Sequence, residues 1–105
     1  MSLRVRVVGA GIAGLTAAYE LARRGAVVEL VERLDGPGLG CSHHAGGMIA
    51  PWCEAESAEP IIVALGLEAL DYWVNDIGVA TQNGSLVVAP PRDRADLARF
   101  ERLTQ

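Results

Sequence analysis

Three glycines and one glutamate are the residues of this sequence whose types and spacing most clearly imply chemistry. Gly9, Gly11 and Gly14 follow the pattern Gly-x-Gly-x-x-Gly at the start of VVGAGIAGLTAAYELARRGAVVELVER, and Glu32 lies near its end. The first glycine permits a tight turn, the second lets backbone approach a pyrophosphate, and the third allows a helix to pack closely on a strand. The pattern therefore predicts that a helix N-terminus binds the phosphates of a dinucleotide. The predicted phosphate-binding residues are Gly9, Ala10, Gly11, Ile12, Ala13 and Gly14.

Glu32 is expected to accept hydrogen bonds from the hydroxyl groups of the adenosine ribose. A carboxylate there would repel a 2′-phosphate, so NADP is disfavoured, and the adjacent Arg33 offsets that repulsion only slightly. A glycine-rich turn without a ligand is the alternative. It explains poorly why strand, loop, helix and acid all occur in register. The motif alone does not decide between FAD and NAD.

The surrounding pattern predicts the elements that position these residues. A strand at 3–8, a helix at 11–24 and a strand at 26–31 form a β-α-β unit with parallel strands. Residues 34–51 are rich in glycine and read as an extended loop with one helical turn near 45–49. A helix with Ser57 as N-cap and Pro60 in its first turn should end at Gly78. Asn83-Gly84 predicts a β-hairpin, and Asp93 is expected to cap a C-terminal helix.

The run GCSHHAGGMIAP, from 40 to 51, resembles the D-amino-acid-oxidase-like flavoproteins, and most closely their glycine oxidases of thiamine biosynthesis. In that family a serine, small residues and a Gly-Met-Leu sequence cross the flavin end of FAD. The corresponding residues here are Ser42, Gly47, Met48 and Ile49. A Ser-His-His run is also similar to the related sarcosine oxidases, so His43 or His44 could lie near the flavin. The alternative is that both histidines are polar loop residues.

The resemblance implies FAD as the cofactor and a considerably longer enzyme. In such enzymes FAD takes a hydride from the α-carbon of an amino acid, and oxygen reoxidises the flavin with formation of hydrogen peroxide. The residues over the flavin come largely from the C-terminal half, so no catalytic residue is assigned here. A sarcosine-oxidase-like or D-amino-acid-oxidase-like enzyme is one alternative. A nucleotide-binding module without catalysis, or a split subunit that needs a partner, is the other.

The fold class expected is α/β, an incomplete Rossmann-like FAD-binding domain. Residues 1–78 would form the FAD-binding portion, and 79–105 the first hairpin and helix of a substrate domain. The strand at 3–8 would keep an open edge, which self-association or a partner chain could cover. A small-molecule amine is the substrate expected for the intact enzyme.

The composition of the chain bears on which partners, metals and membrane segments are expected. The net charge of −4 over 105 residues offers no basic stripe, so nucleic acid is not expected as a partner. No apolar stretch is long enough for a membrane helix. The two cysteines, Cys41 and Cys53, cannot form a zinc site alone, and no metal site is expected. Their small number makes a reduced, cytoplasmic setting the default.

Overall fold

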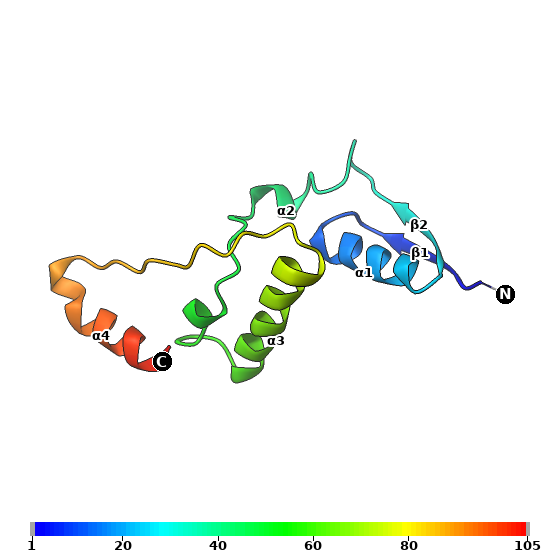
Figure 1. Ribbon diagram of the computed structural model, residues 1–105. Helices are drawn as coiled ribbons and strands as arrows, with labels where there is room; N and C mark the ends of the chain where they lie inside the picture. Colours follow the sequence, from blue (N-terminus) through cyan, green and yellow to red (C-terminus); the bar gives the residue numbers. More distant parts are fainter. Residues whose placement is uncertain (1, 105) are drawn as a thin grey trace. The chain divides into compact units, whose positions relative to one another are not determined.

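The computed structural model describes residues 2–104, which divide into two compact units, one up to Gly47 and one from Met48 (Figure 1). The first unit contains strand β1, helix α1, strand β2 and the short helix α2. Their bounds are Arg4–Val8, Ile12–Arg23, Val27–Val31 and Cys41–His44. The β-α-β unit predicted from the sequence is therefore confirmed, with each element starting one residue later than expected.

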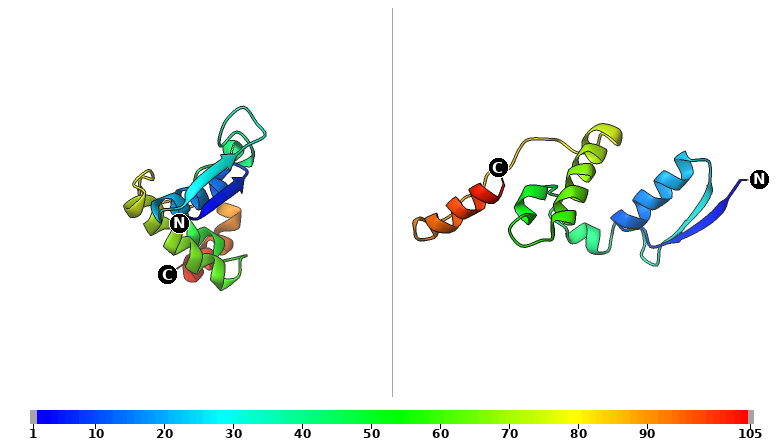
Figure 2. Two further views of the ribbon diagram at one scale, coloured as in Figure 1. Left: turned by 90° about the vertical axis from the view of Figure 1, so that its right-hand side faces the viewer. Right: turned by 90° about the horizontal axis from the view of Figure 1, so that it is seen from below.

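The two strands pair in parallel, with Arg4 opposite Val27 and Val8 opposite Val31. Helix α1 lies along one side of them (Figure 2). The other side carries a cross-strand ion pair, in which Arg6 Nε lies 2.8 Å from a carboxylate oxygen of Glu29. Within residues 2–104 the sheet has only these two strands, so β1 keeps an open edge.

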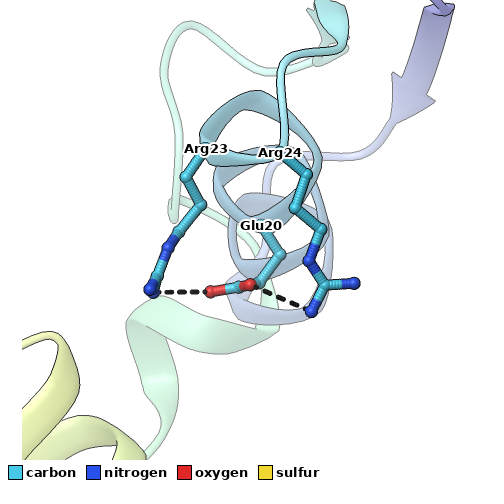
Figure 3. Close-up of polar contacts among 3 residues, drawn as sticks. All are labelled: Glu20, Arg23 and Arg24. Atoms are coloured by element: carbon cyan, nitrogen blue, oxygen red, sulfur yellow. Dashed lines mark hydrogen bonds and ion pairs between the residues drawn. The ribbon is translucent and has the colours of Figure 1, made fainter.

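Helix α1 ends where Gly25 adopts a φ of +89°, a conformation that costs glycine little. Near this end the carboxylate of Glu20 lies between two arginines (Figure 3). Its oxygens are 3.1 Å from Arg23 and 3.5 Å from Arg24. Both pairs face solvent and are screened, so their contribution to stability is small. The arginines also suit the negative end of the helix dipole.

The second unit is built around helix α3. A 3₁₀ helix, η1, precedes α3, a π-helical turn, η2, continues it, and a short 3₁₀ helix, η3, leads into helix α4. The bounds of η1, α3, η2, η3 and α4 are Pro51–Glu54, Pro60–Asp71, Tyr72–Asp76, Pro91–Asp93 and Arg94–Leu103. Pro51 is buried against α3 at Gly66, where an added Cβ would lie 2.6 Å from the Cβ of Pro51. The absence of a side chain at Gly66 therefore permits this packing.

Two helix starts differ from the prediction. Helix α3 begins at Pro60 with Glu59 as N-cap, not at Ser57. The proline keeps Glu59 extended, at ψ 149°, so the helix cannot start earlier. The helical turn expected near 45–49 lies instead at Cys41–His44. The pair Gly46-Gly47, with Gly47 at φ +69°, favours extended and left-handed backbone over a helix.

The β-hairpin predicted around Asn83 and Gly84 is wrong. Residues 79–90 form no strand and run as a single extended segment, drawn in yellow and orange (Figure 1). A type I′ turn needs positive φ at both of its central residues. Gly84 meets this requirement, with a φ of +77°, but Asn83 does not. Leu86 and Val88 are 88% and 79% exposed, so the segment does not bury these apolar side chains against the rest of its unit. An isolated two-stranded hairpin is marginal without such burial.

The helix expected after Asp93 is present as α4, and Asp93 holds its N-cap position, but the Asp93 side chain makes no capping hydrogen bond. The structural division after Gly47 falls inside the predicted FAD-binding portion. The functional boundary after residue 78 stays a prediction. None of the helices formed by residues 2–104 combines the length and apolar character that spanning a bilayer requires.

Candidate dinucleotide-binding site

The glycine loop begins as a continuation of the sheet. Gly9 follows β1 directly and donates its N–H to the carbonyl of Val31 at 2.7 Å. Its φ of +101° turns the chain sharply into α1, as the motif predicts for the first glycine. Gly14 lies so close to this turn that an added Cβ would collide with the carbonyl oxygen of Gly9. The third glycine is therefore required by the contact of α1 with its own preceding loop.

Glu32 follows β2 and is tied to the backbone on two sides. One carboxylate oxygen, Oε2, accepts the N–H of Ala10 at 2.7 Å. The other, Oε1, accepts the N–H groups of Arg33 at 2.8 Å and Leu34 at 3.0 Å. The hydrogen bond from Ala10, followed by that from Leu34, lowers the pKa of the Glu32 carboxyl below its ordinary value. The side chain is therefore ionised at neutral pH.

The middle of the glycine loop is buried. Ala10 is only 1% exposed. Its carbonyl accepts the N–H of Gly38 at 2.7 Å, while its own N–H is bonded to Glu32. The segment that follows β2 thus makes hydrogen bonds to both the N–H and the carbonyl of Ala10. Gly38, with a φ of +75°, was not predicted as a site residue, and its place in the glycine-rich run was its one signal in the sequence.

Ser42 brings the second glycine-rich segment to the N-terminus of α1. Its Oγ accepts the N–H of Ile12 at 2.9 Å, although the two residues are 30 positions apart. A Cβ added at Gly11 would lie 3.3 Å from that Oγ, tighter than an ordinary contact. The absence of a side chain at Gly11 therefore gives Ser42 room to approach the helix. Helix α2 carries Ser42 into this position.

The other predicted residues are not drawn together in the same way. Arg33 is exposed and contributes its backbone N–H to Glu32. His43 is exposed on α2, with its ring centroid 5.3 Å from that of His44. Gly47 ends the first unit, whereas Met48 and Ile49 belong to the second. Contact of any of these with a flavin stays a prediction.

The residues of the first unit fit a dinucleotide diphosphate. The first N–H groups of a helix have no partner within the helix and favour anions. Here Gly11 directly precedes α1, and Ala13 and Gly14 are among its first residues, so small side chains leave the backbone accessible at these positions. Glu32 supplies an ionised acceptor at the end of β2. This arrangement therefore suits a ligand that has phosphate groups at the N-terminus of α1 and hydroxyl groups near Glu32.

The chain belongs to a family of flavin enzymes, because residues 4–105 match the family described as FAD dependent oxidoreductase, DAO. FAD is the cofactor of this family, and the small parallel sheet with its helices is a partial form of the Rossmann-like α/β fold expected for it. The predicted resemblance to D-amino-acid-oxidase-like flavoproteins is thereby confirmed.

Three relatives show the range of the family. The chain is 50% identical over 103 residues to a protein of Rhizobium etli provisionally named thiamine biosynthesis oxidoreductase ThiO. It is 34% identical to a D-amino acid dehydrogenase of Rhodopseudomonas palustris and to a monomeric sarcosine oxidase of a Bacillus species. The alignments cover 97%, 89% and 90% of this chain, but 32%, 20% and 25% of the relatives. No solved structure matches the chain.

Proposed function

We propose that the chain forms the FAD-binding portion of an amino-acid oxidase, most similar to a ThiO-type glycine oxidase of thiamine biosynthesis. The observation that carries the proposal is the glycine loop held by Glu32 and Ser42 at the start of α1. The family match and the 50% identity to the ThiO relative support the cofactor and the substrate class. The chain spans about a third of that relative's length.

Each residue of the site has a proposed task. The N-terminus of α1 and Ser42 bind the diphosphate, and Glu32 accepts a ribose hydroxyl. Arg33, His43, Gly47, Met48 and Ile49 are proposed to complete the contacts toward the adenine and flavin ends. When bound, FAD would accept a hydride from the α-carbon of the amine substrate. The residues described here bind and orient the cofactor, and residues 79–105 begin the substrate-binding portion.

A sarcosine-oxidase-like or D-amino-acid-oxidase-like activity is the second candidate. The Ser42-His43-His44 run on α2 favours it, together with the relatives of those names. Oxygen consumption by the complete gene product on glycine, sarcosine and D-alanine separates the candidates. Glycine as the preferred substrate supports the first proposal, and preference for either of the others replaces it.

A module that binds FAD without catalysis, or that needs a separate partner chain, is a third candidate. The open edge of β1 favours it, because an unpaired edge invites pairing with another chain. Light scattering of the purified chain tests self-association, and a clean monomer at high concentration would contradict it.

The unpaired Cys41 and Cys53 fit the cytoplasmic setting that we propose for the protein.

The cofactor itself is tested by absorbance between roughly 350 and 500 nm, after addition of FAD and desalting, because bound flavin carries its own bands. We expect the wild-type chain and Gly46→Ala to retain flavin, since an added Cβ at Gly46 meets no atom within 4 Å. Gly14→Ala should be colourless. A colourless wild-type chain would show that these 105 residues do not suffice to hold FAD.

A further inference from the structure

The two oxygens of the Glu32 carboxylate serve two different parts of the first unit. Oε1 accepts the N–H groups of Arg33 and Leu34 and so fixes the turn that follows β2. Oε2 accepts the N–H of Ala10, which is 22 residues away in the glycine loop. One side chain thus connects the end of β2 to the loop before α1. This connection goes beyond recognition of a ribose.

The loop is fixed at this point from several directions. Gly9 donates its N–H to the carbonyl of Val31, and the carbonyl of Ala10 accepts the N–H of Gly38, each at 2.7 Å. The bond to Glu32 completes the set at the buried Ala10. An ionised carboxylate can accept about four hydrogen bonds, so three backbone bonds leave about one position for a ribose hydroxyl. Glu32 can therefore hold the loop and accept a hydroxyl together.

We infer that Glu32 is a positioning residue for the diphosphate: through the Ala10 N–H it fixes the glycine loop that leads into the N-terminus of α1. The inference rests on the proposed dinucleotide function. Hydrogen bonds to an ionised acceptor are stronger than neutral ones. Glutamine offers one acceptor oxygen and one donor group, so it cannot accept N–H groups at both ends. Glu32→Gln therefore disturbs the loop as well as the ribose contact.

The test compares ADP with 2′,3′-dideoxy-ADP, which lacks both ribose hydroxyls, by calorimetric titration of the full chain. If Glu32 acts only on the ribose, Glu32→Gln lowers the affinity for ADP and leaves the affinity for dideoxy-ADP unchanged. If Glu32 positions the loop, the affinities for both nucleotides fall by about tenfold or more. Glu29→Gln is the matched control, because Glu29 lies on β2, the strand that Glu32 follows, and its carboxylate accepts a hydrogen bond from the side chain of Arg6. It should leave both affinities unchanged.

Amide hydrogen exchange gives a second readout that needs no ligand. In Glu32→Gln we expect the Ala10 amide to exchange about tenfold faster or more, relative to amides within β1 and β2. Glu32→Asp keeps the charge but is one methylene shorter. The shorter aspartate should still accept the N–H of Leu34, two residues along, and slow the exchange of that amide. It should no longer reach the Ala10 N–H, so the Ala10 amide should exchange faster.

The two readouts separate the possible failures. A wild-type chain that binds neither nucleotide contradicts the proposed function, and the exchange measurement still decides the positioning role. Unchanged exchange at Ala10 in both variants, or unchanged affinity of Glu32→Gln for dideoxy-ADP where the wild type binds it, would overturn the inference. Should Glu32→Gln unfold, the exchange pattern of Glu32→Asp decides.

Discussion

The glycine loop at 9–11, which leads into α1, and the extended segment at 79–90 are both irregular, and they are held very differently. In the loop and at the start of α1, Ala10 and Ile12 are bonded by Glu32, Gly38 and Ser42, which come from one later stretch of chain. In the extended segment, Leu86 and Val88 point mostly into solvent. Irregular backbone becomes well defined where distant side chains supply hydrogen-bond partners. Glycine alone does not define it, since both regions contain glycines of positive φ.

The strongest test of this comparison is Gly14→Ala. The added Cβ would collide with the Gly9 carbonyl oxygen, a backbone atom that the sheet bond to Val31 holds in place. We expect destabilisation of the first unit by ~3 kcal/mol and loss of nucleotide binding. Thermal or urea unfolding and an ADP titration measure both effects, with Gly46→Ala as the control. A Gly14→Ala variant as stable as the control would show that the loop yields more readily than its contacts indicate.

The second unit offers a parallel test at Gly66, within α3. Glycine to alanine in a helix interior ordinarily stabilises by about 1 kcal/mol. Here the new Cβ would lie 2.6 Å from a ring atom of the buried Pro51, which cannot rotate away. We expect Gly66→Ala to lower the free energy of unfolding by about 1–2 kcal/mol. An increase in stability in urea titration would mean that η1 is free to shift away from α3.

A smaller effect is expected from Ser42→Ala. The change removes the acceptor for the Ile12 N–H and also the hydroxyl that we propose donates to the diphosphate, so it should cost about 1 kcal/mol, or roughly fivefold in nucleotide affinity. Thr16→Ala is the matched control, because the Thr16 hydroxyl also bonds Ile12 but donates to its carbonyl, whereas Ser42 accepts the Ile12 N–H. Calorimetric titration with ADP compares the two variants. Equal losses in both would remove Ser42 from the site.

The smallest effect concerns pH. Backbone hydrogen bonds from Ala10, then Leu34 and Arg33, and the charge of Arg33 lower the pKa of Glu32 in the folded chain. The Glu32 carboxylate therefore stabilises the folded chain above the pKa of an unfolded glutamate, about 4.3. This contribution is lost as the pH falls through the lower pKa that Glu32 has in the folded chain. The melting temperatures of wild type and Glu32→Gln should differ above about pH 5 and converge in stronger acid. A difference that grows as the pH falls would contradict this assignment.

The parts of the fold that could be predicted are those in which local and distant constraints agree. Gly9 and Gly14 have the tasks that their motif assigns, and β1, α1 and β2 fall where the periodicity places them. Ser42 was predicted as a cofactor residue, but its bond to Ile12 was not, because spacing gives no information on a contact across 30 residues.

The failures have the opposite cause. Asn83-Gly84 is a strong local turn signal, yet a turn forms a hairpin only when its strands gain burial or further partners. Ser57 was a suitable cap by residue type, but Pro60 and the extended Glu59 decide where α3 starts. In both cases a local preference was read without the constraint that competes with it.

The extended segment has a practical consequence for handling the protein. Proteases bind their substrates as extended, accessible chain, and exposed stretches without secondary structure are their preferred sites of cleavage. Residues 81–88 are exposed throughout and form neither helix nor strand. Limited proteolysis should therefore cut first between η2 and α4. It would release a C-terminal peptide containing α4 and leave the glycine loop intact on the larger product.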